Sequence, residues 1–142
     1  MDPMELSSSL RSAVSALYKV LRKQIYSVST YSMTEIDTIK YLGHNPFLLP
    51  TELAGLTKIK TQSMSQILNR LESEGTITRT PSRDDKRKVL ISLTTSGKKM
   101  VEKFKYERDE WLKSIIEKSL TDKEKEILAK ALPVLKKLAE IK

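Results

Sequence analysis

The stretch from Thr51 to Thr94 limits what this chain can fold into more than any other part of it. Its first half repeats apolar residues at steps of three and four, which indicates helix. Its second half alternates apolar with polar residues, which indicates strand. The pattern predicts a short helix opening at Pro50, a longer helix over about Thr61–Glu74, and strands at Thr76–Thr80 and Lys88–Leu93. The stretch should therefore fold as two helices followed by a β-hairpin.

Apolar residues and turn signals in and beside this stretch predict its buried faces and its ends. We expect a turn near Thr57–Lys60 between the two helices. Gly75 should form the C-cap of the second, because glycine readily adopts the left-handed conformation that ends a helix. Thr95 or Ser96 should cap the helix after the hairpin. The residues expected inside are Leu53, Ala54 and Leu56 in the short helix, and Met64, Ile67, Leu68 and Leu71 in the longer one.

Long helices are predicted on both sides of the central stretch. Residues 5–28 carry one apolar stripe, and residues 96–141 carry two more, divided by a capping box at Thr121–Glu124. Pro133 should kink or split the last helix. The first helix is too long to bury its whole stripe against a small neighbour, so we expect it also to contact a partner chain. The stripe residues are Leu6, Leu10, Val14, Leu17, Leu21, Ile25, Met100, Phe104, Trp111, Ile115, Leu128, Leu132, Leu135 and Leu138.

The helix that precedes the central stretch has two alternative starts. Thr34 with Asp37 forms a variant of the capping box, and Ser32 with Glu35 forms a competing frame. Both frames predict the same inner face, because the apolar residues keep their spacing. The residues expected on that face are Ile36, Ile39 and Leu42.

These elements together predict a mainly α-helical chain built on a winged helix-turn-helix, that is, two short helices followed by a two-stranded wing. At 142 residues the length suits a single domain, with residues 34–94 as the winged part and residues 5–28 and 96–141 as dimerisation helices. Cysteine is absent, which excludes disulfides and Cys-based zinc sites. No signal-peptide core or membrane-length apolar run is visible, so we expect a soluble cytoplasmic protein without membrane contacts.

The net charge of the chain is +8, from 26 Lys and Arg against 18 Asp and Glu. This excess suggests an anionic partner, either nucleic acid or a membrane surface. A solvated, lysine-rich surface would produce the same count. The position of the charge along the chain has to decide between these interpretations.

The longer central helix has a polar face opposite its apolar stripe. The major groove of duplex DNA admits one α-helix, and Thr, Ser and Gln side chains can hydrogen-bond to base edges there. This face has no acidic residue before Glu72. The absence matters because a carboxylate on this face would repel the phosphates of DNA. An ordinary solvated helix face would carry the same residue types. The candidate DNA-contacting residues are Thr61, Gln62, Ser63, Ser65, Gln66 and Arg70.

The hairpin tip favours DNA over a solvated turn. Five basic residues lie within ten positions from Arg79 to Lys88, offset only by Asp84 and Asp85. A tip with this charge can follow the phosphates and insert an arginine into the minor groove. One of the two aspartates is expected to orient a neighbouring arginine through a charge-assisted hydrogen bond. The candidate residues here are Arg83, Asp85, Lys86, Arg87 and Lys88.

Three motifs in combination resemble the MarR family of transcriptional regulators. They are Leu-Glu-x-x-Gly at residues 71–75, Asp-x-Arg at residues 85–87 and Leu-Thr-x-x-Gly at residues 93–97. The predicted helices also follow the family's order, so the resemblance covers nearly the whole chain. It implies an obligate homodimer, paired through its first and last helices, on a pseudo-palindromic operator near the promoter it represses.

The resemblance also implies roles for individual residues. Asp85 and Arg87 match the family's wing pair, with Arg87 as the minor-groove residue. Lys60 departs from the family pattern, which usually has a Ser or Asp helix cap at that position, so the helix start stays open between Lys60 and Thr61. The positions that match base-facing residues are Thr61, Gln62, Ser63 and Gln66.

Many MarR-like repressors release DNA when a small, often phenolic, anion binds between the winged helix and the dimer helices. The resemblance therefore implies an effector site here as well. Aromatic residues at helical spacing are more often core residues, and that alternative stays open. His44 is the only histidine and has no matching ligand cluster, so no metal or other cofactor is expected. The candidate ligand-binding residues are Tyr18, Tyr26, Tyr31, Phe47 and Trp111.

An enzyme would need a catalytic constellation, and the sequence shows no nucleophile–base set, Gly-rich phosphate loop or His/Cys cluster. We therefore expect no enzymatic activity. The main alternative to specific DNA binding is a winged-helix module for protein–protein or architectural contacts, without an effector. An acidic or apolar recognition face would favour that alternative, and the face of this helix is neither.

Overall fold

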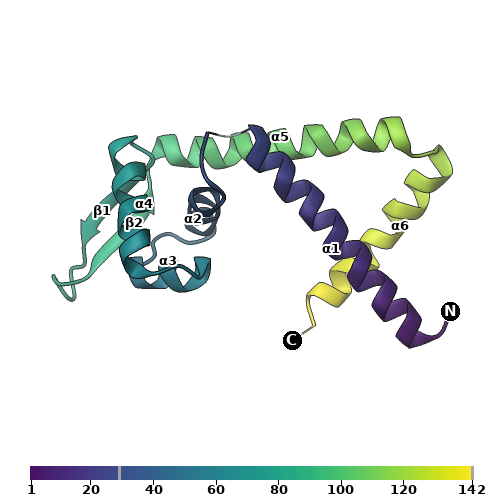
Figure 1. Cartoon of the computed structure of the whole chain (residues 1–142), viewed down its shortest axis with the longest axis horizontal. Coiled ribbons are helices and arrows are strands. Elements are labelled where there is room, and N and C mark those ends of the chain that lie inside the picture. The colour runs from purple at the N-terminus through teal and green to yellow at the C-terminus, as the bar shows by residue number, and fades with distance from the viewer. Residues whose placement is uncertain (29, 142) are drawn as a thin grey trace. The chain divides into compact units, whose positions relative to one another are not determined.

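The structure, a computed structural model, describes residues 1–28 and 30–141, with the side chains of residues 25–28 left aside (Figure 1). Within these residues the chain forms six helices and one two-stranded antiparallel sheet. It divides into two compact units, residues 1–106 and residues 107–142. The elements are α1 (Pro3–Val28), α2 (Met33–Gly43), α3 (Pro50–Thr57), α4 (Thr61–Ser73), β1 (Ile77–Pro81), β2 (Val89–Leu93), α5 (Thr95–Ser119) and α6 (Asp122–Ala139).

The core of the first unit lies where α2, α3, α4 and the sheet meet. Burial of these apolar side chains holds the two central helices and the hairpin in one body. The arrangement confirms the expected fold class, a mainly helical winged helix-turn-helix with long helices on both sides. The fully buried apolar residues of this core are Ile39, Leu53, Met64, Leu68, Leu71 and Ile91.

Leu56 is the one clear error among the residues expected inside the central helices. Its side chain is 43% exposed, whereas Leu53 and Ala54 are buried. At about 100° per residue, Leu56 lies roughly 110° around the helix from the centre of the face that Leu53 and Ala54 define. Because α3 has only eight residues, burial of these two side chains is enough to pack it against the core.

Helix α2 begins in the Ser32 frame. The Ser32 side chain accepts a hydrogen bond from the Glu35 backbone N–H at 3.1 Å, and Glu35 Oε1 accepts one from the Ser32 N–H at 2.8 Å. The alternative start at Thr34 is wrong. Its partner would have been Asp37, whose shorter carboxylate instead accepts from Arg22 Nη2 at 2.8 Å.

The hairpin pairs Ile77 with Leu93 at its base and Pro81 with Val89 at its outer end. Leu48, before α3, adds one isolated bridge by exchanging two hydrogen bonds of 2.9 Å with Ile91. Thr76 lies outside the strand because its N–H bonds to the carbonyl of Leu71 at 2.9 Å, closing the end of α4. Both strands therefore begin one residue later than expected.

The start of α5 is bonded to the end of α4. Thr94 Oγ1 accepts from the Gly97 N–H at 3.0 Å, so Thr94 caps the helix, and the expected caps Thr95 and Ser96 are wrong. The Thr94 N–H also donates to the Thr76 carbonyl at 3.0 Å, and its hydroxyl donates to the Gly75 carbonyl at 2.5 Å. Leu-Thr-x-x-Gly is therefore a structural joint between the winged part and the helix that follows.

The long helices keep much of their apolar stripes exposed. Leu17 in α1 is more than half exposed, as expected of a stripe too long for one small neighbour to bury. Leu132 in α6, which was expected inside, is also more than half exposed. Helix α6 runs unbroken through Pro133, so the expected split does not occur. Among the described residues, no helix combines the length and apolarity that a membrane span requires.

Candidate nucleic-acid interface

Helix α4 presents a polar face to solvent. Its inward side is set by Met64, Leu68 and Leu71, which are buried, while Ile67 is half-buried. The predicted DNA-contacting residues on this helix are all exposed: Thr61, Gln62, Ser63, Ser65, Gln66 and Arg70. The fold thus brings five of them, residues 61–66, together around the first two turns, and leaves Arg70 at the other end.

The first residue of α4 is Thr61, and Lys60 is its N-cap. No side chain caps this helix end, because lysine has no acceptor for the backbone N–H groups of the first turn. A cation is also unfavourable beside the positive end of the helix dipole. An anion that binds at this helix end would pair with the uncapped N–H groups and with the lysine, and would so stabilise the end of the helix.

At the wing tip, Arg87 is exposed and is hydrogen-bonded to Asp85. Asp85 Oδ1 accepts from the Arg87 backbone N–H at 3.0 Å and from Arg87 Nε at 3.2 Å, while the Arg87 side chain is 92% exposed. The side-chain and backbone bonds from Arg87 lower the pKa of Asp85 below its usual value, so the carboxylate stays charged. Of the two aspartates expected to orient an arginine, Asp85 occupies that position.

The remaining cations of the tip surround this pair. Backbone bonds from Ser82 N–H to the Lys88 carbonyl and from Lys88 N–H to the Asp85 carbonyl, both 2.9 Å, close the loop. Arg83, Lys86 and Lys88 are exposed on it. Arg79, farther back on β1, pairs with Glu72 at 3.4 Å.

Arg70 differs from the other candidates because its guanidinium is engaged inside the chain. Its Nη1 donates to both carboxylate oxygens of Glu35 at 2.7 Å, and its Nε donates to Glu74 at 3.2 Å. Tyr31 completes the group: its ring lies 5.2 Å from the Arg70 guanidinium carbon, and its hydroxyl donates to Glu74 at 2.6 Å. DNA contact by Arg70 stays a prediction, and the only sign of this group in the sequence was the capping role of Glu35.

The pKa of Glu74 is lowered, first by the Tyr31 hydroxyl and also by Arg70, against an opposing effect of burial. A carboxyl with a lowered folded-state pKa stabilises the fold above its ordinary pKa of 4.5, and the contribution disappears as pH falls through the folded value. Glu74 is more than a third exposed, so the contribution is at most about 1 kcal/mol.

Tyr31→Phe should therefore lower the free energy of unfolding near pH 7 by up to about 1 kcal/mol, with the difference shrinking below pH 4.5. Urea unfolding at a series of pH values measures the difference, and an NMR titration should show the pKa of Glu74 rising in the variant. A stability gap that is constant from pH 7 to pH 2 would contradict the assignment.

Ligand contact by the aromatic candidates stays a prediction. Tyr18 on α1 accepts from Arg22 Nη1 at 3.2 Å, and Tyr31 is engaged with Glu74. Phe47 is about half exposed, and Trp111 lies on α5 and is half-buried. The side chain of Tyr26 lies outside the described residues.

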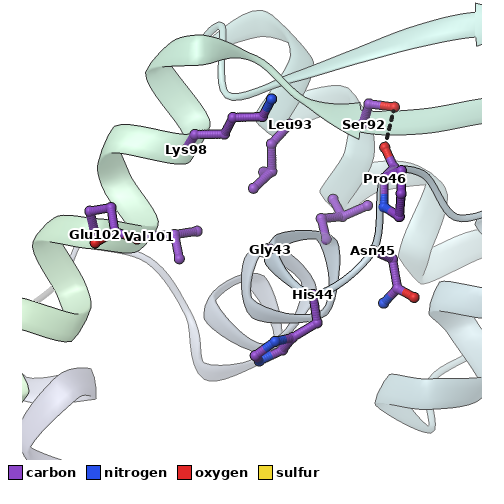
Figure 2. A pocket seen from close by; sticks show the side chains of 10 residues that line it. Gly43, His44, Asn45, Pro46, Ser92, Leu93, Lys98, Val101 and Glu102 are labelled. Carbon is purple, nitrogen blue, oxygen red and sulfur yellow. Dashed lines mark hydrogen bonds between the residues drawn. The ribbon is translucent and has the colours of Figure 1, made fainter.

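A pocket of about 600 Å³ lies instead between the end of α2, strand β2 and the first turns of α5 (Figure 2). Figure 2 shows Val101 projecting from α5 toward Gly43, with Lys98 and Glu102 on the same helix. Sequence reasoning missed it because its walls come from segments about fifty positions apart. Its lining residues are Leu42, Gly43, His44, Asn45, Pro46, Ser92, Leu93, Lys98, Val101 and Glu102.

No group of three or more metal-binding side chains gathers anywhere in the described part of the chain. His44, the sole histidine, is the exposed C-cap of α2.

Comparison with known proteins gives one consistent result. A family model described as MarR family matches residues 30–88. The HTH-type transcriptional regulator FarR of Neisseria gonorrhoeae is 36% identical over 103 residues, which span 72% of this chain and 68% of FarR.

Two solved structures extend the similarity to almost the full length. NadR, solved in complex with 4-hydroxyphenylacetate, is 31% identical, with 96% of this chain and 94% of that chain covered and a TM-score of 0.61. A point mutant of MepR from S. aureus, solved bound to an oligodeoxyribonucleotide, is 25% identical, with 94% and 98% covered and a TM-score of 0.68.

Proposed function

This chain belongs to the MarR family of transcriptional regulators, and on that basis we propose that it is a homodimeric repressor of a pseudo-palindromic operator. In this proposal α4 reads bases in the major groove and the wing tip enters the neighbouring minor groove. The observation that carries it is the wing: the Arg87 side chain is 92% exposed, yet two side-chain hydrogen bonds to Asp85 orient it. A cation that is both exposed and oriented suits an anionic partner.

The geometry of α4 supports the base-reading half of the proposal. Residues at the N-terminal end of a recognition helix reach base edges, and that end of α4 carries Thr61, Gln62, Ser63 and Gln66 in exposed positions. Gln66 can pair bidentately with adenine. Lys60 and the uncapped first turn offer a cation and backbone N–H groups to a phosphate.

Exposed apolar stripes on the long helices support the dimer. A soluble monomer rarely leaves rows of large apolar side chains in water, and a second copy can bury them. Two recognition helices must then lie about 34–36 Å apart, one turn of DNA, to read two half-sites. The residues of these stripes that are more than half exposed are Leu6, Val14, Leu17, Leu132 and Leu138.

Arg87→Ala should weaken binding to all duplexes and lower the slope of log affinity against log salt by roughly one unit per half-site, because one phosphate-region contact is lost. Gln66→Ala should change base preference and leave the slope unaltered. The assay is fluorescence anisotropy with a duplex selected from a random library by the wild-type chain and with a scrambled duplex, at several salt concentrations.

Arg11→Ala is the matched control, since it removes the same charge from an exposed position on α1. Binding that responds to neither salt nor Arg87→Ala would overturn the wing assignment. A wild-type chain that enriches no sequence would favour a winged helix used for protein–protein or architectural contacts.

The proposal includes release of DNA by a small phenolic or anionic effector. Its support is the likeness to NadR, which was solved with 4-hydroxyphenylacetate. Millimolar 4-hydroxyphenylacetate should weaken binding of the selected duplex at least about tenfold, against sodium chloride at equal ionic strength as the control, since salt alone weakens binding. Unchanged affinity across a panel of phenolic acids would remove the effector from the proposal.

A further inference from the structure

We infer that Arg70 acts as a positioning residue, which fixes the far end of the recognition helix α4 to the start of α2 through the buried carboxylate of Glu35. The inference rests on the proposed function, because it concerns how the DNA-reading helix is held. It assigns to Arg70 a role inside the protein in place of the DNA contact that the sequence suggested.

Burial is the first argument. Glu35 is 4% exposed, and an ionised carboxylate in such a place requires charged or hydrogen-bonding partners. Arg70 Nη1 supplies one to each oxygen at 2.7 Å, and the Ser32 N–H supplies another to Oε1 at 2.8 Å. The capping glutamate of α2 is therefore also the anchor of α4, across 35 positions of sequence.

The position of Arg70 along α4 is the second argument. Arg70 follows Gln62 by eight residues, so at about 1.5 Å per residue it lies roughly 12 Å farther along the helix axis. Bases are read by the first turns of such a helix. The Arg70 guanidinium is also engaged within the protein, by Glu35, by Glu74 and by the Tyr31 ring.

The leverage of a rigid helix connects this anchor with DNA reading. Helix α4 spans 13 residues, about 20 Å. If its Arg70 end is no longer held and the helix tilts about its middle, its first turn moves by a similar distance. Sites that recognise a ligand by hydrogen bonds tolerate errors of about 0.5 Å. Loss of the Arg70–Glu35 pair should consequently reduce specific reading more than it reduces general attraction to phosphate.

The same group ties α4 to the segment before α2. Tyr31 and Ser32 lie in that segment, and each bonds to one of the two glutamates that hold Arg70. The orientation of the reading helix thus also depends on the positions of Tyr31 and Ser32.

The test compares Glu35→Gln, Arg70→Gln and the double variant in the full-length chain, with the selected and the scrambled duplex as probes. Glutamine retains the size and one acceptor of Glu35, and Glu35 is too buried to contact DNA itself. Each single variant should lose about tenfold in affinity for the selected duplex and less than about twofold for the scrambled one, with the salt slope unchanged. The double variant should lose no more than Arg70→Gln alone, because that substitution already removes the pair with Glu35.

Glu74→Gln is the backup if the buried substitution prevents folding, since Glu74 is partly exposed. It should produce a smaller loss, about threefold, of the same selective kind. Equal weakening of both duplexes by Arg70→Gln, with a lower salt slope and no effect of Glu35→Gln, would overturn the inference and make Arg70 a phosphate contact.

Amide hydrogen exchange of the free protein separates this inference from the proposed function. Exchange at residues 67–73 of α4 should be faster in Glu35→Gln than in wild type, while α6 should be unaffected. Unchanged exchange in α4 would refute the positioning role even if the wild-type chain binds DNA. Faster exchange in Glu35→Gln, together with a wild-type chain that selects no DNA sequence, would support the positioning role of Arg70 and refute the proposed function.

Discussion

Leu132→Glu in α6 is expected to convert the chain into a monomer at micromolar concentration and to lower its affinity for the selected operator by about a hundredfold or more. Leu132 is 53% exposed in the single chain, so the substitution places a charge on the surface of a folded monomer but inside the interface of a dimer. The loss of affinity follows because two linked half-site contacts become one.

Light scattering measures the mass, and anisotropy with a one-half-site and a two-half-site duplex measures the affinity. Lys130→Gln is the matched control, because it also shifts the charge by minus one on an exposed position of α6. It should leave both the mass and the affinity unchanged. A Leu132→Glu chain that is still dimeric would show that this stripe is not the dimer interface.

Gly97→Ala is expected to lower the free energy of unfolding by about 3 kcal/mol, the upper part of the range for an overpacked site. A Cβ at Gly97 would overlap the backbone carbonyl oxygen of Thr76 and would lie 3.0 Å from Leu93 Cδ2. The carbonyl cannot turn aside, because it accepts the Thr94 N–H at the joint between α4 and α5.

Gly43→Ala is the matched control, since a Cβ there would lie 3.4 Å from both Cγ atoms of Val101, an acceptable contact. Its effect should stay within about 1 kcal/mol, because alanine also favours helix more than glycine does. Urea denaturation measures both, and a Gly97→Ala melting temperature about 10 °C below wild type is the expected thermal result. Equal stability of the two variants would contradict the close packing of Gly97 against the Thr76 carbonyl.

The helix at residues 61–73 shows what local pattern predicts well. Met64, Leu68 and Leu71 repeat at helical spacing, so the buried side follows from the sequence, and the opposite side is exposed by default. The basic hairpin tip follows in the same way from alternating strands and the charged residues between them. These features depend on neighbours a few residues away, and for that reason they were predictable.

Helix ends were less predictable because several residues compete for each cap. Ser32 rather than Thr34 starts α2, since glutamate three positions later reaches back to the backbone N–H, and the shorter Asp37 bonds to Arg22 instead. Thr94 rather than Thr95 or Ser96 caps α5, because its N–H is already held by Thr76. In both cases a contact from elsewhere in the fold selects among locally similar residues.

By itself, the sequence determined the order of helices and strands, the side of α4 that faces solvent and the basic wing, since these follow from periodicity and charge along the chain. Only the tertiary structure decided that Arg70 pairs with buried Glu35, that Gly97 lies against Thr76 and that Leu56 faces water. Ion pairs and close backbone contacts depend on distances between segments that are remote in sequence, and folding brings those segments together.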